Sequence, residues 1–217
     1  MNQTSQETKS RYFSARLKFD PKRDLIWQAI AEHLQSNFID TNDTVIDLGC
    51  GYGDFINHVN AKRKIAVDLE DVEPYLQDDI EFHRSSVESL SFLDADSVNI
   101  VFGSNLLEHL DRAQINNTLV EARRILKPTG KIILIQPNFR LCYKNYFDDY
   151  THQTIFTDES LCGLLMSHDY SIVLKKAGYL PFSMQSRLPK SYWLTRAYLA
   201  LGSPIMSKQM LVVGIKQ

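Results

Sequence analysis

Three glycines at alternate positions form the part of the chain best suited to holding a ligand. Val45–Leu48 is a short apolar run that predicts a buried strand, and Gly49, Gly51 and Gly53 follow it. Because glycine has no side chain, a ligand can approach bare backbone at such a turn. The spacing of Phe55–Val59 predicts a helix directly afterwards, whose first N–H groups would add positive charge. The structural alternative is a tight strand–helix turn that binds nothing.

Asp68 is the second residue that could bind a ligand. It lies near the end of the next predicted strand, Lys64–Leu69, at the edge where the glycine turn is also expected. A carboxylate at this place can accept hydrogen bonds from both ribose hydroxyls of a nucleoside. Glu70 and Asp71 follow it, so a helix cap is the structural alternative. Together with the glycines, Asp68 predicts a nucleoside site.

Acid–base chemistry is predicted mainly in the long connection 137–157, which is rich in aromatic and acidic residues. Connections of this length without clear periodicity are more often functional than structural. His152 is the first candidate for a general base and His109 the second, with Asp148 and Asp149 as orienting or basic groups. A small second core with solvated acids is the alternative. The predicted substrate-binding side chains are Asn138, Arg140, Tyr143, Tyr150 and, further along the chain, Arg187.

The glycine spacing separates two nucleotide-binding families. A dinucleotide fingerprint places its third glycine where this chain has Asp54. The pattern D-x-G-x-G-x-G over Asp47–Gly53 instead resembles the first motif of class I S-adenosylmethionine-dependent methyltransferases. A nicotinamide-dependent oxidoreductase is therefore the less favoured enzyme class.

Further motifs of the same family follow in order. Ser104 and Asn105 resemble its fourth motif, and Leu126–Lys131 resembles its helix-to-strand junction. The family often has an acidic residue near Ser86 that accepts the adenine amino group, and a serine would accept that bond more weakly. The resemblance, which covers about residues 40 to 136, implies S-adenosylmethionine as cofactor. It implies cofactor contacts at Asp47, Gly49, Gly51, Gly53, Asp68, Leu69, Ser86, Val87, Ser104 and Asn105.

Strands alternating with helices predict the α/β fold that positions these residues. The expected sheet is doubly wound, seven-stranded and mostly parallel, and the resemblance implies a C-terminal antiparallel strand. Its ligand would lie beyond the carboxyl ends of the strands, where the motifs converge. We expect a single methyltransferase domain over 1–217, with a helical lead or cap over 1–39 and substrate-side insertions at 137–157 and 178–207.

Composition limits the partners. The 217 residues carry a formal charge of −2, which gives no general attraction to nucleic acid. However, 170–217 has seven basic residues and no acid, so this region is either a solvated surface or one that attracts an anionic substrate or membrane. Three cysteines without ligand spacing favour a reducing, cytoplasmic setting and no metal site. No apolar run is long enough for a transmembrane segment. The amphipathic stretch Tyr192–Leu201 could lie on lipid, on another subunit or on the sheet.

The predicted function is in-line methyl transfer to a small or carrier-linked acceptor, anionic in one interpretation. Pro-Asn-Phe-Arg at 137–140, Tyr-Thr-His at 150–152 and Ser-Arg-Leu-Pro at 186–189 resemble bacterial methyltransferases linked to glycan or secondary-metabolite pathways. A non-catalytic protein that keeps the nucleoside pocket is the third hypothesis. The sequence leaves the acceptor atom and the oligomeric state open.

Overall fold

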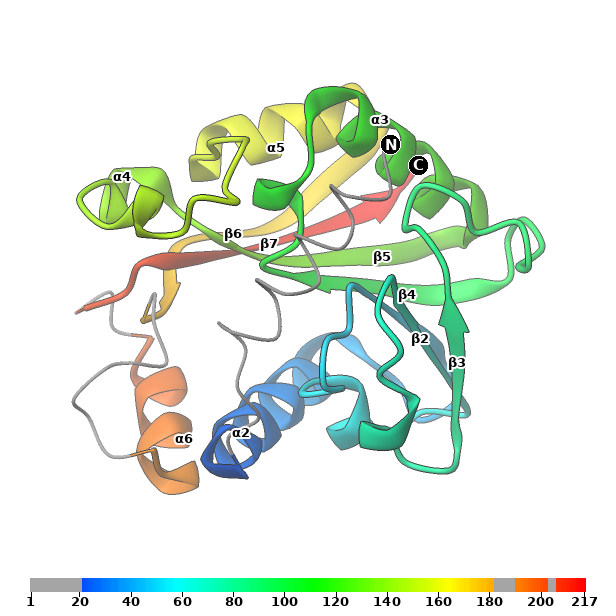
Figure 1. Ribbon diagram of the computed structural model, residues 1–217, viewed down its shortest axis with the longest axis horizontal. Helices are drawn as coiled ribbons and strands as arrows, with labels where there is room; N and C mark the ends of the chain where they lie inside the picture. The colour runs from blue at the N-terminus through cyan, green and yellow to red at the C-terminus, as the bar shows by residue number, and fades with distance from the viewer. Residues whose placement is uncertain (1–20, 182–189, 203–205) are drawn as a thin grey trace.

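A seven-stranded sheet forms the centre of the protein (Figure 1). The computed structural model describes residues 21–181, 190–202 and 206–217. The strands lie in the order β3-β2-β1-β4-β5-β7-β6, and only β7 runs antiparallel to its neighbours β5 and β6. This confirms the predicted fold class. The bounds are β1 Thr44–Leu48, β2 Arg63–Asp68, β3 Ile80–Arg84, β4 Val98–Ser104, β5 Leu126–Pro137, β6 Tyr170–Leu180 and β7 Gln209–Lys216.

Helices cover both faces of the sheet. In Figure 1, α3 and α5 lie on one side, while α2 and α6 lie on the other. The α-helices are α2 Pro21–Phe38, α3 Arg112–Ile125, α4 Phe139–Cys142, α5 Asp158–Ser167 and α6 Tyr192–Leu201. Short 3₁₀ turns complete the connections: η1 Ile56–His58, η2 Glu73–Tyr75, η3 Leu107–His109 and η4 Tyr146–Asp148.

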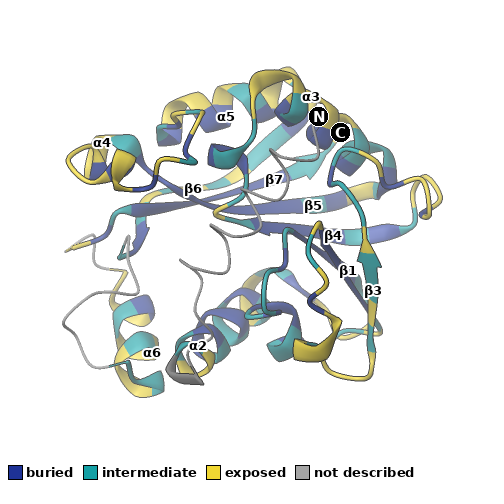
Figure 2. Cartoon of the chain, in the orientation of Figure 1, coloured by how far each residue is buried: buried dark blue, intermediate teal, exposed yellow. Residues whose placement is uncertain are grey.

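The apolar runs of the central strands are explained by burial on both faces. Successive side chains of a strand point to opposite faces, so β1 directs Ile46 and Leu48 into the core under α3 and α5. Val45 points into the opposite core, beneath α2. Figure 2 shows the central strands buried over most of their length, whereas the segment around α4 is largely exposed.

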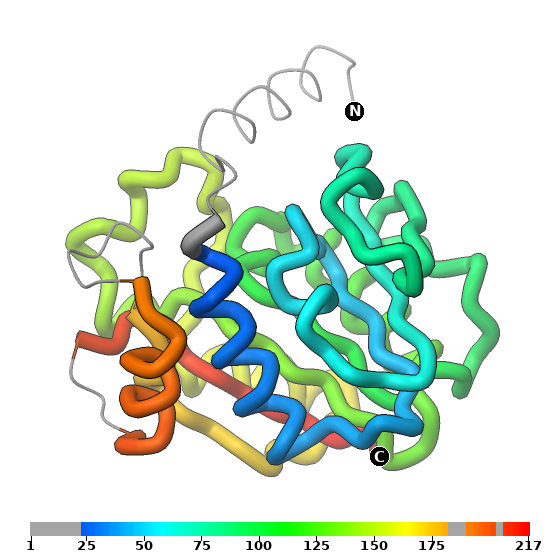
Figure 3. The backbone as a smooth tube through the Cα atoms, turned by 90° about the horizontal axis from the view of Figure 1, so that it is seen from below, coloured from blue at the N-terminus to red at the C-terminus, as the bar shows by residue number. Residues whose placement is uncertain are grey.

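α2 and α6 pack side by side (Figures 1 and 3). The hydroxyl of Tyr192 donates a hydrogen bond to Glu32 at 2.5 Å, and Arg196 lies 3.6 Å from the same carboxylate. Leu199 is buried in the core on that side of the sheet, although Trp193 and Leu201 are exposed. The stretch predicted to lie on the sheet, on lipid or on another subunit therefore packs largely against the first described helix.

The prediction of a helix after the glycine turn is wrong. Residues 56–58 form only the 3₁₀ turn η1, and β2 begins at Arg63. The segment between Gly53 and Arg63 is too short for several helical turns and the return to the sheet. The expected charge of a helix N-terminus is therefore not available to a ligand here, and the site depends on backbone shape and on Asp68.

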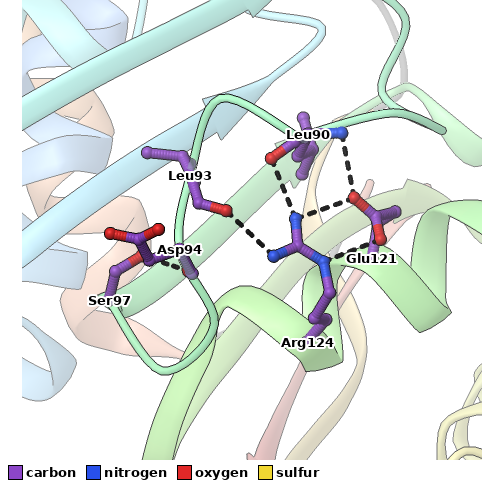
Figure 4. A network of polar contacts seen from close by, with 6 residues as sticks. All are labelled: Leu90, Leu93, Asp94, Ser97, Glu121 and Arg124. Atoms are coloured by element: carbon purple, nitrogen blue, oxygen red, sulfur yellow. Dashed lines mark hydrogen bonds and ion pairs between the residues drawn. The ribbon is translucent and has the colours of Figure 1, made fainter.

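The segment after β3 is fastened to α3 by one arginine (Figure 4). Arg124 donates hydrogen bonds to the carbonyls of Leu90 and Leu93, each at 2.9 Å. Glu121 receives two further bonds from Arg124 and accepts the Leu90 N–H at 3.0 Å. This network fixes the loop that leaves β3 just beyond Ser86.

Candidate functional site

The glycine turn has a backbone that excludes most side chains. Gly49, Gly51 and Gly53 have φ angles of +68°, +54° and +73°. At Gly53, an added Cβ would lie only 2.5 Å from Leu76 and 2.8 Å from the Asn57 amide. The positive φ disfavours a side chain at this position, and an added Cβ would force the ends of the Leu76 and Asn57 side chains to move. Bare backbone therefore lies at the end of β1.

Asp68 is directed toward this turn. The Gly51 N–H donates to Oδ2 of Asp68 at 2.9 Å, and the Glu70 N–H donates to Oδ1 at 3.0 Å. The carboxylate is 8% exposed, and its burial raises its pKa. No helix begins at Asp68, so it is not a helix cap, although its bond to Glu70 closes a local turn. Each oxygen can accept a further bond, so the carboxylate can also serve ribose hydroxyls.

Asp47 lies beneath the turn. Its carboxyl is buried, and burial together with the charges of Asp68 and Asp54 raises its pKa well above the usual value. A hydrogen bond from the Ile56 backbone acts in the opposite direction. Asp47 therefore holds the turn in place from inside the protein.

The remaining residues that the resemblance assigned to the cofactor follow β2, β3 and β4. The Ser85 N–H donates to the carbonyl of Asp68 at 3.0 Å, which brings Ser86 and Val87 close to that strand end. Leu69, beside the carboxylate, is 55% exposed. The parallel order therefore places these residues at the same edge of the sheet as the glycine turn.

Asn105, directly after β4, has an unusual conformation. Its φ is +50°, a value that asparagine tolerates better than most residues. Its side chain donates to Ser104 Oγ at 3.1 Å and accepts from Gln209 Nε2 at 2.6 Å. Ser104 and Asn105 are thus held by contacts from β7 at the strand end where the sequence placed them.

The connection after β5 is attached to the turn after β4. The backbone N–H groups of Gln153 and Thr154 both donate to the carbonyl of Glu108, at 2.7 and 3.1 Å. The Thr154 hydroxyl donates to the carbonyl of Leu110 at 2.7 Å. These bonds bring the predicted base His152 to the β4 end of the sheet.

His109 and His152 lie together. Their ring centroids are 4.9 Å apart. Nδ1 of His152 is 2.6 Å from the carbonyl oxygen of Tyr146, and Nδ1 of His109 is 2.9 Å from the hydroxyl oxygen of Thr151. The Thr151 hydroxyl in turn donates to Asp149 at 2.5 Å. The predicted residues His109, His152 and Asp149 therefore belong to one cluster.

Other predicted residues have different surroundings. Asp148 is exposed and accepts a hydrogen bond from Asn145. Asn138 is buried, and its amide bonds to Asp158, to the carbonyl of Ala177 and to the N–H of Arg140, so it holds the start of the connection in place. Arg140, Tyr143 and Tyr150 are exposed, and Arg187 lies outside the described residues.

Glu108 also belongs to this cluster, although it was not among the site residues predicted from the sequence. Its side chain is 1% exposed, and neither carboxylate oxygen has a hydrogen-bond partner among the described residues. Burial, with a smaller effect of Asp149, raises its pKa to about 8. The available signal was a charged residue in a turn of leucines, directly before His109. Gln136, at the end of β5, is likewise buried with both amide atoms unpartnered in the described part of the chain.

Residues 46–134, which include the glycine turn and the ends of β2 and β4, match the family model of a methyltransferase domain. Over this stretch the chain is similar to methyltransferase domains. The positive-φ glycines and the inward-facing Asp68 fit the S-adenosylmethionine that the sequence resemblance implies, because they offer bare backbone and a hydrogen-bond acceptor to a nucleoside. No curated protein sequence matches the chain at a significant level.

Several solved structures share the fold of this chain. An S-adenosylmethionine-dependent methyltransferase from Thermotoga maritima has 17% identity and a TM-score of 0.67, covering 97% of this chain and 95% of its own. One from Archaeoglobus fulgidus has 18% identity and a TM-score of 0.63, covering 88% and 94%. A chain in the Haloferax volcanii complex between the Trm112 methyltransferase activator and a methyltransferase has 20% identity and a TM-score of 0.67, covering 88% and 90%.

The remaining features concern membrane-spanning helices and the basic C-terminal region. None of the helices in the described ranges has the length and apolar character that a membrane crossing requires. In the basic C-terminal region, Lys175, Arg196 and Lys216 are paired with the acids Glu159, Glu32 and Asp96. These ion pairs favour the interpretation of this region as an ordinary solvated surface.

Proposed function

We propose that this protein transfers the methyl group of S-adenosylmethionine to a small or carrier-linked acceptor bound at the carboxyl ends of β4 and β5. The observation that carries the proposal is the convergence of two groups at one edge of the sheet. The glycine turn and Asp68 provide the nucleoside side. The cluster of His109, His152 and Asp149, at the end of β4, provides the acceptor side.

The reaction needs alignment more than activation. The sulfonium methyl is already electrophilic, so the protein mainly has to hold an oxygen, nitrogen or carbon nucleophile in line with the leaving sulfur. Such alignment is worth roughly 7–11 kcal/mol. A general base adds about 10²–10⁴-fold.

His152 is the preferred base in this proposal. A carbonyl oxygen can only accept a hydrogen bond, so the contact with Tyr146 places the ring proton on Nδ1. The lone pair then lies on Nε2, the nitrogen that would take a proton from the acceptor. Asp149 orients His109 through Thr151 in a similar way.

The class of acceptor is inferred from the sequence resemblance alone. The segments 137–140 and 150–152 resemble methyltransferases of glycan and secondary-metabolite pathways, which makes acceptors with hydroxyl groups the first to test. The anionic acceptor considered from the sequence has less support, because several C-terminal cations are already paired within the chain.

A nicotinamide-dependent oxidoreductase is less compatible with the turn. Asp54 occupies the position of the missing third glycine, and its side chain forms an ion pair with Arg23. A close packing of helix on strand, which that glycine would permit, is replaced here by a partly buried charge pair.

Calorimetric titration tests the cofactor directly. We expect binding of S-adenosylmethionine and S-adenosylhomocysteine and none of NAD; binding of NAD alone would overturn the proposal. Transfer of labelled methyl to a panel of hydroxylated acceptors then tests turnover. His152→Ala should lower the rate at least 100-fold while cofactor affinity stays within threefold. Wild-type protein that binds the cofactor but methylates no acceptor would support a non-catalytic role instead.

A further inference from the structure

We propose that Glu108, His109 and His152 bind one divalent transition-metal ion. A carboxylate oxygen of Glu108 and one ring nitrogen of each histidine all lie within 4.8 Å of one another. Glu108 and His109 come from η3, and His152 comes from the connection after β5, so the three converge only in the folded chain. Their separation along the sequence explains why spacing alone predicted no metal site.

The carboxylate of Glu108 is the first independent support. A buried charged group is costly unless it is paired, hydrogen-bonded or bound to a metal. Glu108 is 1% exposed, and both of its oxygens lack a hydrogen-bond partner among the described residues, so the group is unsatisfied even as a neutral carboxyl. Its backbone cannot move away easily, because its carbonyl accepts the N–H groups of Gln153 and Thr154. A cation between the oxygens and the two rings would satisfy this group.

The protonation of the histidines is the second support. Histidines that bind metals usually donate their other ring N–H to a carbonyl, a carboxylate or water. The Nδ1–H of His152 is directed at the carbonyl of Tyr146 at 2.6 Å. Because the Thr151 hydroxyl donates to Asp149, its oxygen accepts from Nδ1 of His109. Both rings therefore carry the lone pair on Nε2, and a lone pair is what a metal-binding nitrogen requires.

The donor set indicates the class of ion. Two imidazoles and one carboxylate suit zinc, iron, cobalt or manganese, whereas calcium and magnesium prefer oxygen ligands. Metal–ligand distances of about 2.0–2.2 Å correspond to ligand atoms roughly 3–3.5 Å apart. The present separations of up to 4.8 Å thus require a contraction of up to roughly 1.3–1.8 Å, within the reach of side-chain rotation. Three protein ligands leave a coordination position open, as in catalytic sites.

With the ion bound, Nε2 of His152 is a ligand and no longer a base, and the ion would take over acceptor activation through its open coordination position. A hydroxyl oxygen of the acceptor could occupy it, and the ion would lower the pKa of that hydroxyl. This consequence rests on the proposed methyl transfer, but metal binding itself does not. The two ideas can therefore fail separately.

Metal binding is measured on the full chain after treatment with a chelator. Co²⁺ is titrated while visible absorption is followed, and Zn²⁺ is then added as a competitor. We expect one Co²⁺ per chain with ligand-field bands, displaced by Zn²⁺. Glu108→Gln and His152→Ala should each weaken binding at least 10- to 100-fold. His58→Ala is the matched control, because His58 also lies beside a carboxylate, 2.8 Å from Asp24, and its loss should change nothing.

Wild-type protein that binds no Co²⁺ at micromolar concentrations would overturn the inference, whatever the variants do. Binding that survives Glu108→Gln and His152→Ala, or that is lost in His58→Ala, would overturn it as well. Circular dichroism and thermal unfolding establish that each variant is folded. Should Glu108→Gln fail to fold, His109→Asn and His152→Ala decide the question.

Discussion

Replacing Asp68 by asparagine tests the nucleoside side of the site. The two carboxylate oxygens accept the N–H groups of Gly51 and Glu70 at 2.9 and 3.0 Å. Asparagine keeps one acceptor oxygen and places an NH₂ group where the other oxygen stood. One buried backbone donor then faces another donor, which costs about 1–3 kcal/mol of folding stability. Because burial raises the pKa of Asp68, removal of its charge offsets part of this cost.

Cofactor affinity should fall more clearly than stability. A hydrogen bond to a charged group contributes about 1.5–3 kcal/mol, so losing one to a ribose hydroxyl weakens binding roughly 10- to 150-fold. Isothermal titration with S-adenosylhomocysteine measures this change, and urea unfolding measures the loss of stability. Asp71→Asn is the control, because this nearby acid is exposed. If Asp68→Asn binds within threefold of the wild type while remaining folded, Asp68 does not hold the ribose.

Three other substitutions test the supports of the site. Gly53→Ala should lower both cofactor affinity, measured by titration, and stability, measured by urea unfolding, by at least about 1–2 kcal/mol, because φ is +73° and the new Cβ would lie 2.5 Å from Leu76. Gly163→Ala is the control. Its Cβ would meet nothing within 4 Å in α5, so it should be neutral or slightly stabilising in the same two assays. Arg124→Ala should cost about 2–3 kcal/mol in urea unfolding, since two carbonyls of the loop after β3 lose their donor, and an unchanged midpoint would contradict this. The bond from Arg124 lowers the pKa of Glu121 below its usual 4.5. The folded state therefore releases this proton more readily, and the stabilisation present above about pH 4.5 is lost as the pH falls through the folded pKa. Thermal unfolding between pH 6 and 3 should show a steeper loss for the wild type than for Glu121→Gln, and parallel curves would refute it.

The sheet could be predicted because its signals are local. Each central strand is an apolar run buried on both faces. A polar side chain that can bind a ligand stands at the strand end, such as Asp68 in β2, or directly after it, such as Asn105 after β4. Since parallel strands present their carboxyl ends at one edge, finding the strands was enough to place these residues together. The glycine turn could also be predicted, because three glycines at alternate positions are a local pattern in the sequence. All three have positive φ in the structure.

The acceptor side could not be predicted in the same way, because it depends on long-range contacts. Nothing in the sequence shows that Gln153 and Thr154 donate to the carbonyl of Glu108. Without that contact, Glu108 resembled a solvated acid, and its burial went unnoticed. The structural contacts of Asn138 could not be predicted for the same reason, since its partners Asp158 and Ala177 lie on other elements. The absent helix after Gly53 shows a further limit: local spacing favoured a helix, but the short return to β2 left no room.

The attachment of residues 153 and 154 to the turn after β4 divides the long connection into two parts with different tolerance to change. The end that carries His152 is bound by backbone groups, so its position does not depend on which side chains precede it. The stretch 143–150 is largely exposed, with Tyr143 and Tyr150 open to solvent. Exposed side chains such as Tyr143 and Tyr150 can therefore change while the backbone contacts of His152, including that with the Tyr146 carbonyl, stay in place. This part of the surface can thus vary without moving the histidine.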